Sequence, residues 1–448
     1  MHPRQLAGRG VRNTFAIALG VGISLTSANA VASDGVSEIE VLDTLALEEN
    51  QSLAAFDVRV EEARLQASFE ENRLPEPVFE YMLDLSVPGT GHFTTGHMVR
   101  IMQMLPRPGA RERRAGPARA SQEVARAQKR AVSADLLRDI RLDVVELARI
   151  EARLELIEDE VGLIDDAIGL VEELAGLGRA EHGELLQLEL AREAALDRRS
   201  ELRSSRRERR AALAGRLGVD TAVIDEVDIG PQILEDWLID LPSRDELLAM
   251  AQENEPRLST YDAEMAVAAA QVELVEEQNR PWPSIMVGYS NMPPMWEMGG
   301  ARDQMIQVGF SIPLPIFGSQ YDDQASQWQA SQQALEQDRS QREQSLAGEV
   351  DALLAGWNAD YERLNRHERE LLPLAGDLAR QVLIGVELGQ RSAAEFILAV
   401  QQEIEVEGRI IELRAGLLEQ LVELQRFTGG AIGADQDWAY PQQVGVRQ

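Results

Sequence analysis

The spacing of hydrophobic residues changes from a helical period to a strand period twice along the chain. Residues 50–73 and 258–280 carry apolar side chains every three or four positions, which predicts two amphipathic helices. Each helical stretch ends at a pair of prolines, which the interior of a helix does not tolerate. Beyond the prolines, apolar and polar residues alternate, as they do in a strand with two different faces. We therefore predict two β-hairpins, at 77–105 and 283–313.

The alternation gives the predicted strands two chemically different faces. One face is aromatic and aliphatic, whereas the other carries charged, small and methionine residues. The apolar set is Phe79, Tyr81, Leu83, Leu85, Val99, Ile101, Leu105, Ile285, Val287, Tyr289, Ile306, Val308, Phe310 and Ile312. In a soluble α+β protein this face would pack on a helix of the same chain, whereas in a membrane barrel it would face lipid.

After each hairpin the helical period returns for a long stretch. Residues 110–176 and 319–388 are rich in Ala, Gln, Glu, Leu and Arg, with apolar residues three or four positions apart. At about 1.5 Å per residue, each stretch could extend on the order of 100 Å. Pro373 is predicted to kink the second stretch near its end. Each stretch then breaks at a Leu-Gly pair and returns, which predicts antiparallel helix pairs with a coiled seam.

The order of elements is duplicated because the sequence itself repeats. Matching residues in the two halves share one offset of 207 positions: Asn72 and Asn279, Arg73 and Arg280, Met98 and Met305, and Pro106 and Pro313. We predict an internal two-fold repeat, in which each repeat holds a helix, a hairpin and a long helix pair. Its parts are repeat 1 at 31–217, a linker at 218–241, repeat 2 at 242–430 and a C-terminal tail at 431–448.

The first thirty residues have the features of a secretory signal peptide. Arg4, Arg9 and Arg12 precede an apolar run, and Ala28-Asn29-Ala30 is a small-x-small cleavage site. The run is too short to cross a hydrocarbon layer of about 30 Å, which disfavours the alternative of a membrane anchor. We predict removal of residues 1–30 and no transmembrane helix in the mature chain, which leaves a soluble protein or a barrel.

Charge and composition exclude several functions. The chain has 44 Lys and Arg against 76 Asp and Glu, a net charge of −32, which disfavours binding to nucleic acid. It has no cysteine, so disulfides and thiolate metal sites are excluded. The sequence contains no nucleophile–His–acid arrangement, phosphate loop or H-E-x-x-H spacing. We therefore expect neither an enzyme nor a cofactor.

Four strands cannot span a membrane alone. The smallest membrane barrels use eight strands, and an open edge in lipid leaves backbone groups unpaired at a cost of several kcal/mol each. If these strands span a membrane, several copies of the chain must share one barrel, and four strands from each of three copies would make twelve. The residues themselves leave this barrel and a soluble sheet both open.

At the junctions between helix and strand, the sequence resembles the TolC-like outer-membrane efflux channel family, especially its heavy-metal exporter branch. The resemblance rests on the duplication, on Asn72-Arg73 and Asn279-Arg280, and on the segment from Ser311 to Gly318. It implies an α+β membrane protein in the outer membrane of a Gram-negative bacterium, extending into the periplasm. The implied assembly is a homotrimer with a trimeric twelve-stranded β-barrel, four strands per protomer, continued by a long α-helical periplasmic barrel.

The resemblance also implies a function. The chain would be a passive conduit in a tripartite efflux system, embedded in outer-membrane lipid. An inner-membrane RND pump would deliver substrates to it through a periplasmic adaptor of the membrane fusion type, and heavy-metal cations are one candidate cargo. The alternative is a soluble periplasmic coiled-coil scaffold or adaptor protein.

The helix turns match the family's periplasmic aperture. The resemblance implies that Glu184 and Arg391 pair in the closed state and that Glu395 joins a ring of acids from three protomers. Leu398 departs from the pattern, because some members carry a second acid there, and this puts the strength of the ring in doubt. Each charge could instead be a solvated helix end. The turns that would dock the adaptor contain Leu177, Gly178, Leu388 and Gly389.

Methionine is concentrated around the two predicted hairpins. Members of this set are Met82, Met98, Met102, Met104, Met286, Met292, Met295, Met298 and Met305. Thioether and imidazole groups suit soft cations such as Cu(I), so the candidate ligands are Met292, Met295, Met298, His92 and His97. Methionine also fills irregular space, and loop methionines lack fixed geometry. The sequence therefore assigns no metal site.

Overall fold

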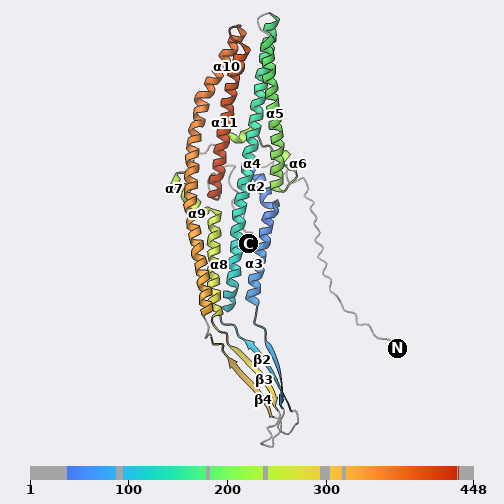
Figure 1. Cartoon of the computed structure of the whole chain (residues 1–448), viewed down its shortest axis with the longest axis vertical. Coiled ribbons are helices and arrows are strands. Elements are labelled where there is room, and N and C mark those ends of the chain that lie inside the picture. Colours follow the sequence, from blue (N-terminus) through green and yellow to red (C-terminus); the bar gives the residue numbers. More distant parts are fainter. Residues whose placement is uncertain are drawn as a thin grey trace, which may run out of the picture.

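A computed structural model of the chain describes residues 38–86, 94–177, 182–235, 241–292, 303–314, 319–430 and 432. The protein is long and narrow, with a helical body and a four-stranded sheet at one end (Figure 1). Among these residues, no helix combines the length and the hydropathy needed to cross a membrane. The predicted signal peptide lies outside the described residues, as does the predicted tail apart from residue 432.

The helices of the first half surround one very long helix. They are α2 (Glu38–Glu49), α3 (Gln51–Asn72), α4 (Ala110–Gly176) and α5 (His182–Leu217). Asn50 caps α3, because its side chain accepts a hydrogen bond from the backbone N–H of Ser52 at 2.9 Å. Helix α4 has 67 residues and runs the full length of the helical body (Figure 1). Its bounds are those predicted from the apolar period, whereas α2 was not predicted.

In the second half, the counterpart of α4 is divided into two successive long helices. Its helices are α7 (Arg244–Asn254), α8 (Pro256–Gln278), α9 (Ser319–Arg366), α10 (Leu372–Glu387) and α11 (Ala393–Phe427). Between α9 and α10, residues His367–Leu371 form the π-helical turn η3. Pro373 follows at the start of α10, where its ring and missing N–H disturb the preceding turn. The kink predicted at Pro373 corresponds to this wider turn.

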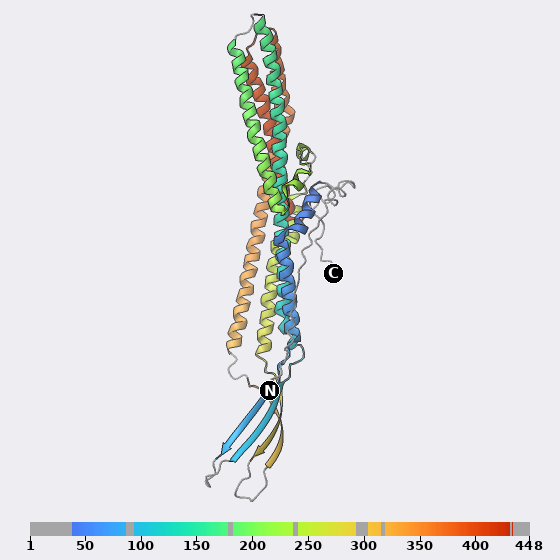
Figure 2. The same cartoon turned by 90° about the vertical axis from the view of Figure 1, so that its right-hand side faces the viewer.

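The long helices lie side by side in two sets of four. Near the sheet the order is α3, α4, α8 and α9, and at the far end it is α5, α4, α11 and α10 (Figure 1). The side view shows that the sheet continues the long axis of the helices instead of folding back on them (Figure 2). The end of α4, the start of α5 and the turn between α10 and α11 lie at the end opposite the sheet (Figure 1). We call that end the tip.

The helical body has one large hydrophobic core at mid-length and a smaller one at the tip. The mid-length core includes Ile140 and Leu147 of α4 and Leu421 of α11. The tip core joins all four helices there, with Val171 of α4 and Phe396 of α11 among its members. A small third cluster lies on α4 and α5. The body is thus stabilised by its own packing.

The described part of the predicted linker, residues 218–235, is folded onto this body. It contains the short helix α6 (Thr221–Asp225) and the 3₁₀ turn η1 (Pro231–Leu234). Ile224, Ile229 and Ile233 from this segment are buried in the mid-length core. The segment is therefore part of the structure and not a free tether between two halves.

The sheet is a purely antiparallel meander. Its strands are β1 (Val78–Ser86), β2 (Thr94–Met104), β3 (Ser284–Met292) and β4 (Asp303–Ser311), in the order β1-β2-β3-β4. All four lie within the predicted hairpins. Strands β2 and β3 come from different halves of the sequence and pair directly, for example Ile101 with Val287.

Candidate functional site

The sheet presents a continuous apolar face to its surroundings. The pairing register aligns Phe79, Ile101, Val287 and Val308 in one row across all four strands. Their exposed fractions are 65%, 51%, 51% and 76%. The neighbouring row contains Tyr81, Val99, Tyr289 and Ile306. Side chains that a soluble protein would bury are therefore open across the whole width of the sheet.

No helix among the described residues packs extensively on this face. In the part of the chain that the structure describes, none of the three hydrophobic clusters contains a residue of β1 to β4. This argues against the soluble α+β alternative, in which the apolar face would pack on the chain's own helices. Each of the two outer strands is paired along one edge only, because β1 pairs only with β2 and β4 only with β3 among the described strands. Each edge offers a row of backbone groups to a further strand.

The opposite face of the sheet is polar and rich in methionine. Arg100 pairs with Glu80 across β1 and β2 at 3.3 Å. The methionines of the described strands all point to this side, since they pair with one another or with its polar residues. Those with described side chains are Met82, Met98, Met102, Met104, Met286 and Met305.

The structure separates the predicted metal-binding candidates. His97 pairs with Leu83 and Asn291 on the apolar side of the sheet, and its Nδ1 lies 2.9 Å from the hydroxyl of Tyr81. It therefore faces away from the methionines. His92, Met295 and Met298 lie outside the described residues, and Met292 ends β3. Among the described residues, no group of three or more His, Asp or Glu side chains could hold a metal ion.

At the tip, the turn after α10 is tightly determined. Gly389 adopts a left-handed conformation with φ of 72°, which favours glycine. Its N–H donates to the carbonyl of Val386 at 2.9 Å, and the N–H of Gln390 donates to that of Gly385 at 2.8 Å. These two bonds form a Schellman motif, which satisfies carbonyls at the end of the helix. A Cβ on Gly385 would lie 2.4 Å from Cγ of Arg391, so a side chain at that position would displace Arg391.

The predicted aperture residues lie near this turn, but the structure pairs two of them with each other. Arg391 donates to Glu395 Oε1 at 3.2 Å. The other carboxylate oxygen of Glu395 accepts from the backbone N–H of Ser392 at 3.2 Å, and Ser392 Oγ accepts from the N–H of Glu395 at 3.3 Å. This reciprocal capping box begins α11. Glu184 lies in the first turn of α5, and its pairing with Arg391 stays a prediction.

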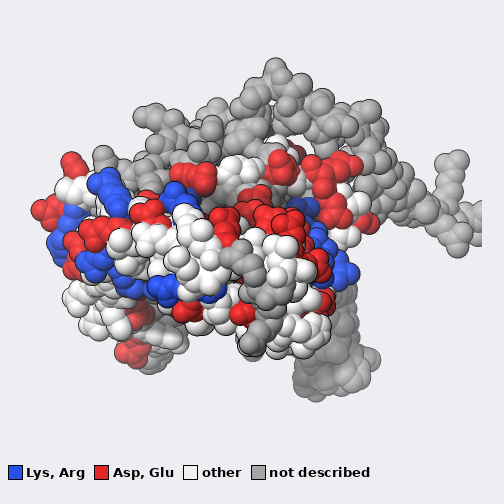
Figure 3. All heavy atoms as spheres, turned by 90° about the horizontal axis from the view of Figure 1, so that it is seen from above, with Lys and Arg blue, Asp and Glu red and all other residues white. Residues whose placement is uncertain are grey.

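The tip also exposes large apolar side chains. Leu177 is 72% exposed and Leu388 is 57% exposed, each as the residue that ends its helix. Leu398 on α11 is 61% exposed. Gly178 lies outside the described residues. Figure 3 looks down on this end and shows acidic and basic side chains side by side around it.

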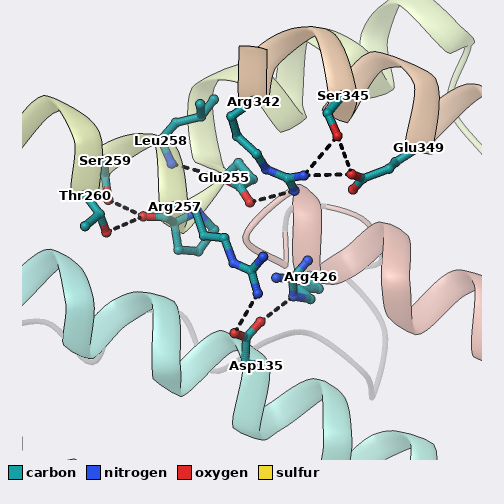
Figure 4. Close-up of polar contacts among 11 residues, drawn as sticks. Asp135, Glu255, Arg257, Leu258, Ser259, Thr260, Arg342, Ser345, Glu349 and Arg426 are labelled. Carbon is teal, nitrogen blue, oxygen red and sulfur yellow. Dashed lines mark hydrogen bonds and ion pairs between the residues drawn. The ribbon is translucent and has the colours of Figure 1, made fainter. Parts of the chain in front are cut away.

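At mid-length, ion pairs tie the helices together (Figure 4). Asp135 of α4 accepts from Arg257 of α8 at 3.1 Å and from Arg426 of α11 at 2.5 Å. Burial raises the pKa of Asp135, but the hydrogen bonds and charges of Arg426 and Arg257 outweigh it, and the net pKa lies below its ordinary value. Arg342 of α9 joins the same junction by bonding Glu255 at 3.1 Å. This network cross-links four helices.

A second polar link is fully buried. Arg141 of α4 is 0% exposed and bonds Asp43 of α2 at 2.5 Å and Gln425 of α11 at 2.8 Å. Nothing in the local sequence pattern indicates these partners. The link attaches the N-terminal helix α2 to the middle of the molecule.

Comparison with known proteins agrees with this architecture. Residues 247–430 match the family described as outer membrane efflux protein. No curated protein matches the sequence. The outer-membrane channel OprN is 18% identical with a TM-score of 0.67, over 88% of this chain and 90% of its own. CusC, solved in a study of transmembrane channel formation, is 17% identical with a TM-score of 0.69, over 87% of this chain and 92% of its own.

A further solved structure extends the comparison. The outer membrane protein VceC of Vibrio cholerae is 16% identical with a TM-score of 0.65, over 88% of this chain and 96% of its own. At such identities the three structures establish a shared fold. The predicted likeness to outer-membrane efflux channels is thereby confirmed, since the family match and the fold agree.

Proposed function

We propose that the chain is an outer membrane efflux protein, as the family match over residues 247–430 indicates, and that three copies form one passive export channel. Each copy supplies four strands to a shared twelve-stranded barrel, and the long helices continue this barrel into the periplasm. The internal two-fold repeat supplies each copy with two equivalent hairpins. In this role the protein would catalyse no reaction and would only enclose the path of the cargo.

One observation supports this proposal above all: the apolar face of the sheet is exposed and belongs to no core of the chain. Removing apolar surface from water lowers the free energy by about 25 cal/mol per Å². An apolar face therefore stabilises the protein only when it is covered. Lipid is that cover, because the strands β1, β3 and β4 have nine residues and β2 has eleven. Strands of about nine to eleven residues cross a bilayer when tilted.

The open edges of the sheet support a shared barrel. In lipid, an unpaired strand edge costs several kcal/mol per backbone group. Pairing of β1 with β4 of a neighbouring copy removes both edges at once, and repetition of that contact closes a ring. At the junction with the helices, Arg114 stacks on Trp282 at 4.4 Å. Tryptophan is enriched where a membrane meets water, and this supports a position of the junction at the periplasmic rim of the proposed barrel.

The tip is the proposed docking end. Leu177 and Leu388 each expose an apolar side chain at this end, the latter beside the left-handed turn at Gly389, and a periplasmic adaptor can pack against them. Gly178 belongs to the same proposed surface by its sequence position. An inner-membrane pump would deliver the cargo through this adaptor.

The aperture proposal involves Glu184, Arg391 and Glu395. The side chain of Arg391 is 56% exposed, and an exposed ion pair contributes little free energy. Arg391 can therefore leave Glu395 and pair with Glu184 at a small cost in free energy. We propose that the Glu184 pair latches the closed aperture and that the Glu395 pair marks the released state. Arg391→Ala should raise the conductance of the resting channel, and an unchanged resting conductance would refute the latch.

Cell fractionation combined with conductance tests the main proposal. The channel should enter the outer-membrane fraction, migrate as a heat-dissociable trimer and conduct ions in a planar bilayer. The alternative, a soluble periplasmic scaffold or adaptor, predicts a detergent-free periplasmic protein without conductance. That second result would overturn the proposal.

A further inference from the structure

The helix pair α10–α11 is weakly packed between the two hydrophobic cores. Helix α11 contributes buried residues to the tip core up to Val400 and to the mid-length core from Ile410 onward. None of the residues 401–409 between them is buried. In the segment that leads into α10, residues 365–374 likewise include no buried residue, and they contain the π-helical turn η3. A stretch with few buried apolar contacts opens more easily than the packed helix on either side of it.

Two glutamates occupy this weakly packed stretch of α11. Glu403 and Glu407 are both half-buried, and their spacing of four positions places the side chains on one face of the helix. Glu403 Oε1 lies so close to α10 that a Cβ on Gly376 would be 3.0 Å from it. On the side of α4, the charge of Asp159 acts on Glu407. Carboxylates of two helices therefore meet where the hydrophobic core is interrupted.

The basic groups around these acids are bound elsewhere. Arg380 of α10 approaches the same position beside Gly376, but it pairs with Asp377 at 2.8 Å. Arg414, two turns further along α11, pairs with Glu368 of η3 at 2.9 Å. The other charged and titratable groups at this level line a cavity with Glu405, on the opposite side of α11; they are Arg153, Arg198, Glu201, His367, Arg409 and Glu412. No described residue forms an ion pair with Glu403 or Glu407.

This arrangement favours one shared proton. Like charges four positions apart on a helix repel each other. Burial, reinforced by the charges of Glu403 and Asp159, raises the pKa of Glu407. When one glutamate is protonated, its O–H can donate to the carboxylate of the other, and a charge-assisted hydrogen bond replaces the repulsion. Loss of that proton restores the repulsion in the part of the helix pair that has the least apolar packing.

We propose that Glu403 and Glu407 form a proton-sensitive contact, which holds α11 against α10 while the two carboxylates share a proton and loosens when that proton is lost. The packing of this helix pair is therefore tighter at low pH and weakens as pH rises. The contact lies within one copy of the chain and goes beyond the proposed function. It rests on that function only for its consequence, because Arg391 and Glu395 lie at the tip end of the same helix pair.

Hydrogen exchange of the full-length protein in detergent tests the contact. Exchange is followed by mass spectrometry at about pH 5 and about pH 8, on either side of the range where a carboxyl of raised pKa titrates, and is corrected for the intrinsic pH dependence of amide exchange. Amides of residues 374–386 and 401–409 should be at least about threefold better protected at the lower pH. The variant E403Q/E407Q should lose this difference, because its neutral amides neither repel nor titrate. Protection that is independent of pH in the parent protein would overturn the proposal.

Glu405 provides a matched control on the same helix. It lies between the two glutamates in the sequence, is exposed, and points about 200° away from both. E405Q should therefore keep the pH difference of the parent protein. A difference that survives in E403Q/E407Q would overturn the proposal and assign the effect to another titratable group, such as His367. Fractionation and conductance are separate measurements, so exchange without pH dependence leaves the channel proposal intact, and a soluble protein with pH-dependent exchange would refute only the channel.

Discussion

Replacing one residue on the apolar face of the sheet tests whether that face lies in lipid. Val308 lies near the middle of β4 and is 76% exposed in the isolated chain. An arginine near the bilayer midplane of a membrane barrel costs about 2–4 kcal/mol. If the face were in water, an exposed substitution would change stability by only about 0.5 kcal/mol in either direction. The two environments therefore predict clearly different outcomes for Val308→Arg.

The neighbouring residue provides the control. Gln307 points to the opposite, polar face and pairs with Gly288. Gln307→Arg introduces the same side chain one position away, and it should leave stability within about 0.5 kcal/mol of the parent protein. Because the period of a strand is two, the two variants differ only in the face that receives the charge.

Equilibrium unfolding by urea from phospholipid vesicles measures this difference. For each protomer, Val308→Arg should lower the folding equilibrium constant by roughly 30- to 700-fold, which corresponds to about 2–4 kcal/mol. Thermal dissociation of the trimer in detergent should move in the same direction. Equal stability of the two variants would refute the assignment of the apolar face to lipid.

Three further changes probe the helical body. Asp43→Ala removes the carboxylate that the buried Arg141 bonds at 2.5 Å and should cost about 3–5 kcal/mol, measured by denaturant unfolding. Gly389→Ala forces a left-handed backbone on a residue with a Cβ and should cost about 1–2 kcal/mol, read as a lower melting temperature. Burial, reinforced by the nearby Glu403 and Asp159, raises the pKa of Glu407. The folded chain therefore retains this proton above pH 4.5, where the unfolded chain loses it, and stability falls as pH rises through the raised pKa. Glu407→Gln should stabilise the protein at neutral pH and flatten that slope.

The elements of the fold were predictable where their signal is local. The alternation from Phe79 to Leu85 indicates a strand within a few residues, and the prolines before it mark where the helix must end. The same local signal places the methionines on one face, because residues two positions apart share a side. Which rows they form depends on the pairing of β2 with β3, whose residues are nearly two hundred positions apart, and only the structure supplies that register.

The partners of buried polar groups were not predictable, because they depend on long-range packing. Arg141 and Gln425 are 284 residues apart, and each lies in a helix whose apolar pattern gives no sign of the other. The partner of Arg391 was different, since Glu395 follows it by four positions, a spacing that places two side chains on the same face of a helix. The family resemblance pointed to Glu184 as a partner of Arg391, and that pairing stays a prediction.

The two roles of Glu395 can be separated by a single conservative change. Its carboxylate caps α11 through Ser392 and pairs with Arg391, so a proposed ring of acids at the aperture competes with two local contacts. Glutamine also completes a capping box, because its side-chain oxygen accepts the same backbone N–H. Glu395→Gln therefore removes the charge but retains the cap, whereas Glu395→Ala removes both.

If the charge serves the aperture, the two variants should reduce the cation selectivity of the conducting trimer to the same extent. If Glu395 only caps the helix, Glu395→Gln should keep the parent selectivity, and Glu395→Ala should lower the melting temperature through loss of a cap worth about 1 kcal/mol. Reversal potentials in a salt gradient, measured beside thermal unfolding, distinguish these cases. A glutamine variant with unchanged selectivity would refute the acidic ring. Apart from the ring, the charge of Glu395 contributes only its exposed ion pair with Arg391, which is worth about 0–1 kcal/mol.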